Sequence, residues 1–125
     1  MTSFIYIGAS NFNAEQLRNA LLRQIDQGFE CFSSVQNNNN FAVSDIREEF
    51  RQICAGHEIE IVTYSPLGAG FLTGKYQNGV QAGTRFALVP GHQIIYFNKA
   101  ACQRLIKLQM VSARSGYTQT HLALA

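Results

Sequence analysis

The sequence predicts a parallel α/β fold in which about three strands alternate with helices. Short apolar runs recur along the chain, and each of the first two is followed by a stretch with helical periodicity. The helical stretches begin at a residue that can cap them and end close to a glycine. Strand, helix, strand, helix, strand, loop and helix is the order expected when crossover helices join parallel strands.

The first strand is expected at Phe4–Ile7, an apolar run that stops at Gly8. A continuous apolar run is typical of a strand buried on both faces. After a turn, Asn13 is expected to cap a helix, with Gln16 as its reciprocal partner in a capping box. Gly28 is expected to end this helix. The apolar stripe of the helix consists of Leu17, Ala20, Leu21 and Ile25.

The second strand is expected at Phe32–Gln36, and an asparagine-rich loop is expected over Asn37–Asn40. Asp45 has the residue type that caps helices, so the next helix is expected to begin there and to end at Gly56. The buried face of this helix is expected to hold Ile46, Phe50 and either Ile53 or Cys54.

The third strand is expected at Ile59–Tyr64 and ends at a proline, which cannot donate to a strand ladder. The loop from Pro66 to Phe97 contains six of the ten glycines and both prolines. Long ordered loops of this kind are often functional. Asn98 then caps a helix that Gly116 interrupts, and Thr118 starts another. The stripe of the first of these helices is Ala101, Leu105, Leu108 and Val111.

Composition excludes several classes of protein. The chain has 125 residues, is 46% hydrophobic and 14% charged, and carries a net charge of +2 without any run of Lys and Arg, which argues against a nucleic-acid footprint. The three cysteines, Cys31, Cys54 and Cys102, lie far apart in the sequence. Their spacing matches neither a zinc-binding motif nor the cysteine pattern of a disulfide-rich domain. No apolar run approaches the ~20 residues that span a bilayer, and no leader pattern opens the chain. These features predict a cytoplasmic protein.

Three segments resemble one family in its own order and spacing. Gly8–Phe12 resembles the GxSNF signature at the end of the fifth barrel strand of aldo-keto reductases, Ser34–Asn37 the VQN of the sixth strand, and Tyr64–Tyr76 the long block at the seventh. Weaker similarity continues through Thr84–Phe86, Tyr96–Asn98 and Thr118–Ala125. The asparagines after the VQN segment depart from the family pattern.

The resemblance implies a (β/α)8 TIM barrel that transfers a hydride from NADPH to a carbonyl carbon, with the site at the carboxyl ends of the strands. A complete barrel needs roughly 250 residues. We therefore expect residues 1–125 to form an incomplete half barrel of about three parallel strands with flanking helices. The cofactor-binding residues implied are Ser10, Asn11, Gln36, Tyr64, Ser65, Leu67, Gly68, Gly70, Leu72, Gly74, Lys75 and Arg85.

These residue types suit the parts of NADP. Ser10, Asn11 and Gln36 offer donors and acceptors to a nicotinamide carboxamide, although Ser and Asn also stabilise turns without any ligand. Tyr64 could stack on the nicotinamide ring or serve as a core tyrosine. The glycines let backbone N–H groups approach a pyrophosphate, and Lys75 and Arg85 add charge; glycine-rich loops without a ligand are also common.

The tetrad of the family, Asp, Tyr, Lys and His, lies on the first four barrel strands, for which this chain has no counterpart, so we assign no catalytic residue. The expectation is a truncated NADP-dependent aldo-keto reductase that is inactive alone. The alternatives are a non-enzymatic half-barrel module for interaction or oligomerisation, and a part of a longer active enzyme. Two open sheet edges favour self-association or pairing with a missing barrel half.

Overall fold

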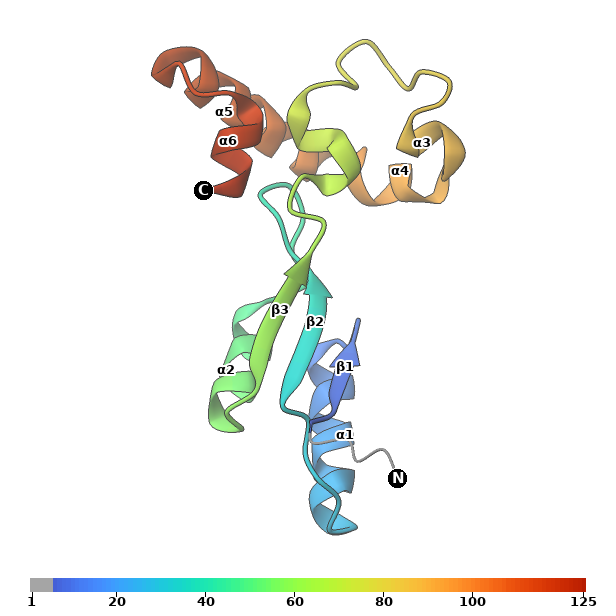
Figure 1. The fold of residues 1–125 in the computed structure, drawn as a ribbon, viewed down its shortest axis with the longest axis vertical. Coiled ribbons are helices and arrows are strands. Elements are labelled where there is room, and N and C mark those ends of the chain that lie inside the picture. The colour runs from blue at the N-terminus through green and yellow to red at the C-terminus, as the bar shows by residue number, and fades with distance from the viewer. Residues whose placement is uncertain (1–5) are drawn as a thin grey trace. The chain divides into compact units, whose positions relative to one another are not determined.

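A computed structural model describes residues 6–125 of the chain (Figure 1). The expectations for Phe4 and Ile5 lie outside the described residues. The chain divides into two compact units. Unit 1 comprises Met1–Asn38 and Asp45–Tyr64, and unit 2 comprises Asn39–Ser44 and Ser65–Ala125.

Unit 1 contains a parallel sheet of three strands in the order β1-β2-β3, which confirms the predicted topology. The strands are β1 (Gly8–Ser10), β2 (Ser34–Asn38) and β3 (Glu60–Tyr64). Ser10 is paired with Gln36, and Gln36 with Val62. The carboxyl ends of all three strands therefore lie at one edge of the sheet.

The prediction for the first strand was wrong in its position. The side chains of Tyr6 and Ile7 are 77% and 40% exposed and precede β1, although the Ile7 carbonyl still accepts from the Ser33 N–H at 2.8 Å. The paired residues are Gly8–Ser10, because the strand extends only where β2 lies alongside it. The first three residues of the Gly8–Phe12 motif therefore belong to a strand.

The second strand begins and ends two residues later than predicted. Asn37 and Asn38 belong to β2 and are only 2% and 6% exposed, so the expected asparagine loop was wrong for these two residues. Both pair with residues of β3. Ladder pairing outweighs the low intrinsic strand preference of asparagine here.

Two helices cover one face of the sheet (Figure 1). Helix α1 (Ala14–Asp26) begins with the predicted capping box between Asn13 and Gln16, and Gly28 follows its end with a φ of 66°. Helix α2 (Glu48–Gly56) ends at the predicted glycine. The N-cap of α2 is Arg47 without a side-chain hydrogen bond, so the prediction that Asp45 caps this helix was wrong.

The strands are buried on one face rather than on two. Leu17, Leu21, Val35, Phe50 and Cys54 form the core between this face and the helices, together with Ile46 and Ile59. Within unit 1 no described element covers the other face, and Gln36 and Val62 on that face are exposed. Ile25, predicted as part of the α1 stripe, is 56% exposed because the stripe reaches past the sheet.

Unit 2 contains helices and turns. The predicted loop from Pro66 to Phe97 folds into the 3₁₀ segment η1 (Gly68–Thr73) and the short helices α3 (Arg85–Leu88) and α4 (Gly91–Tyr96). Helix α5 (Lys99–Ser115) is followed by α6 (Gln119–Leu124). Asn98 and Thr118 cap them as predicted, and Gly116 separates them in the left-handed conformation.

Aromatic rings form the core of unit 2. Phe86 is fully buried, stacks on Tyr76 with 4.4 Å between the ring centroids, and lies 5.8 Å from Tyr96 and 5.3 Å from Phe97. Helix α5 adds Ala101 and Leu108, as its stripe predicts, whereas Val111 is 50% exposed and was wrongly included. Among residues 6–125, every helix is too short or too polar to cross a bilayer.

Candidate functional site

Three of the predicted cofactor-binding residues lie together at the carboxyl ends of β1 and β2. The Gln36 carbonyl oxygen accepts from the Asn11 backbone N–H at 2.9 Å and from the Ser10 hydroxyl at 3.1 Å. The Ser10 and Gln36 side chains are exposed on the face that α1 and α2 leave uncovered. The register of the parallel sheet therefore brings together two amides and a hydroxyl from two motifs.

Tyr64 joins this cluster from the end of β3. Its hydroxyl donates to Asn11 Oδ1 at 2.7 Å, so the ring and the amide hold one another in place. Asn11 has a φ of 61°, a left-handed conformation that asparagine tolerates better than most residues. Residues held in this region often lie at binding sites. We call Ser10, Asn11, Gln36 and Tyr64 the strand-end cluster.

The remaining predicted residues lie in unit 2, in a glycine-rich segment that spans residues 65–76 and in α3. The Gly68 N–H donates to the Ser65 carbonyl at 2.9 Å, and the Gly70 N–H donates to the Leu67 carbonyl at 3.1 Å. The Gly74 N–H also points to a carbonyl of this segment, at 3.5 Å. These backbone donors close turns within the segment, and their contact with a pyrophosphate stays a prediction.

Leu72 lies in the core of unit 2 with no exposed surface. Its N–H donates to the Leu67 carbonyl at 3.1 Å. Leu72 therefore anchors the glycine-rich segment in the core of unit 2. The sequence pattern does not separate this role from contact with a ligand, because a buried leucine and a ligand-lining leucine have the same spacing.

Lys75 and Arg85 carry the charges available to a phosphate in this part of unit 2, and both are exposed. Lys75 Nζ lies 5.1 Å from the centroid of the Tyr76 ring. A Cβ at Gly70 would lie 2.6 Å from Lys75 Cε, so glycine leaves room for the lysine side chain. Lys75 and Arg85 are therefore the exposed cations nearest in sequence to the glycine-rich turns.

Sequence reasoning missed the structural roles of two asparagines, Asn37 at the end of the VQN motif and Asn40 three residues later. Asn40 donates to the Ser65 carbonyl at 3.0 Å and to the Tyr96 hydroxyl at 3.3 Å, which ties the 39–44 turn to the glycine-rich segment. Asn37 donates to the Phe12 carbonyl at 2.8 Å, and its Oδ1 is buried without a hydrogen bond. The run of four asparagines was the available signal, but Asn37 and Asn40 have different partners.

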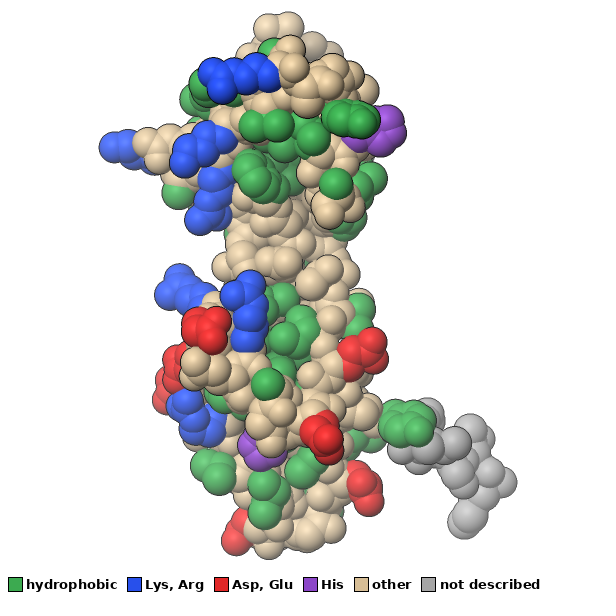
Figure 2. All heavy atoms as spheres, turned by 90° about the vertical axis from the view of Figure 1, so that its left-hand side faces the viewer, with side chains coloured by type: hydrophobic (Ala, Val, Ile, Leu, Met, Phe, Trp, Pro, Cys, Tyr) green, Lys and Arg blue, Asp and Glu red, His purple; other side chains and the backbone are tan. Residues whose placement is uncertain are grey.

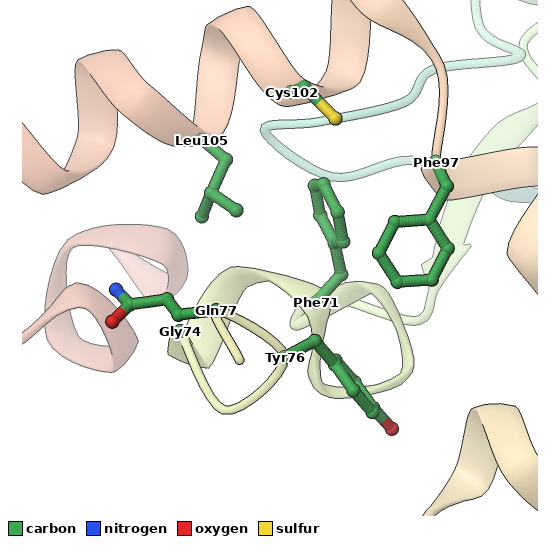
Figure 3. Close-up of a pocket in the computed structure, with 7 residues that line it drawn as sticks. All are labelled: Phe71, Gly74, Tyr76, Gln77, Phe97, Cys102 and Leu105. Carbon is green, nitrogen blue, oxygen red and sulfur yellow. The ribbon is translucent and has the colours of Figure 1, made fainter. Parts of the chain in front are cut away.

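A pocket of about 150 Å³ lies between the glycine-rich segment and α5 (Figure 3). Phe71 and Tyr76 project from the segment, and Cys102 and Leu105 project from α5. Lys75 and Arg85 do not line it, so the pocket is distinct from the charged groups predicted to meet phosphates. Its walls are mainly apolar side chains, with Gln77 as a polar residue among them.

The possible metal ligands and the cysteines are dispersed in the described part of the chain. No group of His, Cys, Asp or Glu among these residues is placed to hold a metal ion, and the three cysteines are free thiols. Burial raises the pKa of the Cys54 thiol, which lies in the core of unit 1. This thiol is a packing residue.

The fold and the strand-end cluster define a parallel α/β protein with polar side chains at the carboxyl ends of its strands, which is where such proteins bind ligands. Residues 5–125 match the model of the aldo/keto reductase family, and the chain belongs to this family. The three parallel strands and their helices are accordingly a partial (β/α)8 barrel.

A second comparison shows similarity to a plant protein. Over 51 residues the chain is 43% identical to a "Probable voltage-gated potassium channel subunit beta" of Arabidopsis thaliana. The aligned segment makes up 40% of this chain and 16% of the length of that relative. The chain thus matches only a small part of the relative.

Proposed function

We propose that this chain supplies the part of an aldo-keto reductase barrel that binds NADP, and that the 125-residue chain alone does not reduce carbonyl compounds. The observation that carries the proposal is the strand-end cluster in a chain that belongs to this family. In the cluster, Ser10, Asn11 and Gln36 bring hydroxyl and amide groups to one edge of the sheet.

The residues fit the two chemically different ends of the cofactor. The amides of Asn11 and Gln36 match the donors and acceptors of a carboxamide, and the Tyr64 ring offers an aromatic face. In unit 2, Lys75 and Arg85 suit phosphate oxygens, because charge-assisted hydrogen bonds are the strong ones. When bound, NADPH supplies the hydride, and the residues of this chain hold and orient it.

Catalysis of carbonyl reduction also requires a group that protonates the carbonyl oxygen. We assign this role to no residue of the chain, since no described titratable residue lies in the strand-end cluster except Tyr64, whose hydroxyl donates to Asn11. We therefore expect saturable binding of NADPH without turnover.

The test is titration of the purified chain with NADPH, followed by nicotinamide emission, beside an assay for reduction of a generic aldehyde. Lys75→Ala should weaken binding by roughly tenfold or more, since a hydrogen bond to a charged group contributes ~1.5–3 kcal/mol. Gln36→Ala should weaken it by roughly two- to tenfold, since a neutral hydrogen bond contributes ~0.5–1.5 kcal/mol. Gln52→Ala and Lys107→Ala, on exposed helix surfaces, are the matched controls. Turnover by the chain alone, or equal loss in the controls, contradicts the proposal.

The second candidate is a non-enzymatic half-barrel module that pairs with another copy or with another chain. The observation that favours it is the sheet face that no described element of unit 1 covers, where Gln36 and Val62 are exposed. The relative named as a channel subunit suggests the same kind of role. A stable oligomer by light scattering, with no NADPH binding at any concentration, would favour this candidate over the first.

A further inference from the structure

The charges of the chain are divided between the two units. All eight Asp and Glu residues lie in unit 1, whereas six of the ten Lys and Arg residues lie in unit 2. Figure 2 shows the division on one face of the molecule, with acidic side chains only over unit 1 and basic and apolar side chains over unit 2. The six cations of unit 2 are Lys75, Arg85, Lys99, Arg104, Lys107 and Arg114.

The cations of unit 2 have no acidic partner within their own unit. Both ion pairs between described residues, Arg18–Glu49 and Arg51–Glu48, lie in unit 1. The positive potential of unit 2 is therefore not neutralised locally, and surfaces of one charge sign attract polyanions of the opposite sign.

Helix α5 concentrates this charge on its outward face. Ala101 and Leu108 are buried, and Arg104 donates to the Ala42 carbonyl at 2.7 Å, which fixes the inward side of the helix. Helical periodicity places the exposed residues on the opposite arc. We call this arc, which consists of Lys99, Ile106, Lys107, Met110 and Arg114, the α5 outer face.

The α5 outer face mixes cations with large apolar side chains. Ile106 is 54% exposed and Met110 is 49% exposed, one helical turn apart. The phosphate backbone of a nucleic acid binds cations but offers no partner to exposed aliphatic side chains. A membrane surface stabilises both kinds of side chain. Anionic headgroups attract Lys and Arg, and the boundary between headgroups and acyl chains accepts apolar side chains.

We propose that the α5 outer face binds membrane surfaces that contain anionic lipids, with the helix lying in the plane of the headgroups. The helix is 17 residues long and carries no acidic residue. Lys75 and Arg85 lie outside it, so the proposal does not depend on the cofactor site.

The test is flotation of the full 125-residue chain with phosphatidylcholine vesicles that contain either no phosphatidylserine or about 30% of it, as in anionic leaflets. Binding is expected only to the anionic vesicles, and raising the salt from roughly 0.1 M to roughly 0.5 M should abolish it. Lys99→Gln, Lys107→Gln and Arg114→Gln together should weaken binding by on the order of 100-fold, since each cation near the surface contributes about fivefold.

A matched variant removes the same charge from unit 1. Arg23→Gln, Arg47→Gln and Arg51→Gln together alter three exposed cations and should leave vesicle binding unchanged. Ile106→Ser with Met110→Ser should weaken binding several-fold while its salt dependence persists, because the two apolar side chains act independently of charge. Circular dichroism checks that each variant remains helical.

Several outcomes would overturn the proposal. Equal binding to neutral and anionic vesicles would remove the role of the cations, and equal loss in the two triple variants would remove the role of the α5 outer face. Tighter binding to a single-stranded oligonucleotide than to anionic vesicles would identify a nucleic-acid surface instead. Salt-sensitive oligomers by light scattering, without vesicle binding, would show that the cations meet the acidic residues of a second copy.

Discussion

Unit 1 and unit 2 have cores of different chemistry. In unit 1, aliphatic side chains such as Leu17, Leu21 and Val35 pack between a sheet and two helices. In unit 2, four rings from Phe71, Tyr76, Phe86 and Tyr96 fill the core among short helices and turns. Pairing of parallel strands therefore organises unit 1, while contacts between aromatic rings join the short helices and turns of unit 2.

The two units also differ in what they present to a ligand. Unit 1 offers neutral amides and hydroxyls, held by strand register at one sheet edge. Unit 2 offers Lys and Arg side chains without acidic neighbours in the unit. The comparison teaches that one chain can present neutral polar groups at the ends of ordered strands and cations on a helical unit stabilised by aromatic packing.

The largest expected effect comes from removing a central ring of unit 2. Phe86→Ala should destabilise the protein by ~3–5 kcal/mol, because the substitution leaves a cavity beside the Tyr76 and Phe97 rings. Hydrogen exchange measured by mass spectrometry should show protection lost in unit 2 and retained in the strands of unit 1.

Phe50→Ala is the matched variant in the core of unit 1, where Phe50 is 1% exposed. It should cost a similar ~3–5 kcal/mol and give the reverse pattern of exchange. If both variants lose protection evenly across the chain, the two units unfold together and the comparison between separate cores is wrong.

The next effect concerns the turn chemistry of the glycine-rich segment. A Cβ at Gly68 would lie 2.8 Å from Tyr96 Cε1, at a residue whose φ is 59°. Gly68→Ala should therefore cost ~2–4 kcal/mol in urea unfolding, from backbone strain and overpacking combined. Gly79→Ala, with a φ of 89° and no atom within 4 Å, should cost only ~1 kcal/mol. Equal costs would show that the Tyr96 contact is easily relieved.

A smaller effect tests helix capping in unit 1. Asn13 accepts from the Gln16 N–H at 2.8 Å and caps α1, so Asn13→Ala should lower the free energy of unfolding by ~1 kcal/mol. Asp45→Ala should change it by less than ~0.5 kcal/mol, because Asp45 is exposed and does not cap α2. A large cost for Asp45→Ala would restore its predicted role as a cap.

The smallest effect is a dependence of stability on pH through Cys54. Burial raises the pKa of this thiol in the folded state above its ordinary value of 9.0. As pH rises through that value, the unfolded state loses its proton first and gains stability, so the free energy of unfolding falls. Urea titrations from pH 7 to above the ordinary thiol pKa should show this fall, and Cys54→Ala should remove that component. An unchanged slope in Cys54→Ala would show that other groups cause the fall.

Local signals in the sequence determined much of the fold. The capping residues Asn13, Asn98 and Thr118 and the terminal glycines Gly56 and Gly116 act within a few residues of their partners, and the helices begin and end as they predict. The alternation of strands and helices fixed the parallel topology in the same way. These interactions depend on neighbours in the chain, which the sequence shows directly.

Only the tertiary structure decided the details that depend on distant partners. Pairing with β3 extends β2 to Asn38, and packing of α1 and α2 on one side leaves Gln36 and Val62 on the other face exposed. Turns within the glycine-rich segment use the N–H groups of Gly68 and Gly70 that the motif suggested for a ligand. The sequence determined the elements and the family; strand register, burial and hydrogen-bond partners depend on contacts between residues many positions apart, so they required the fold.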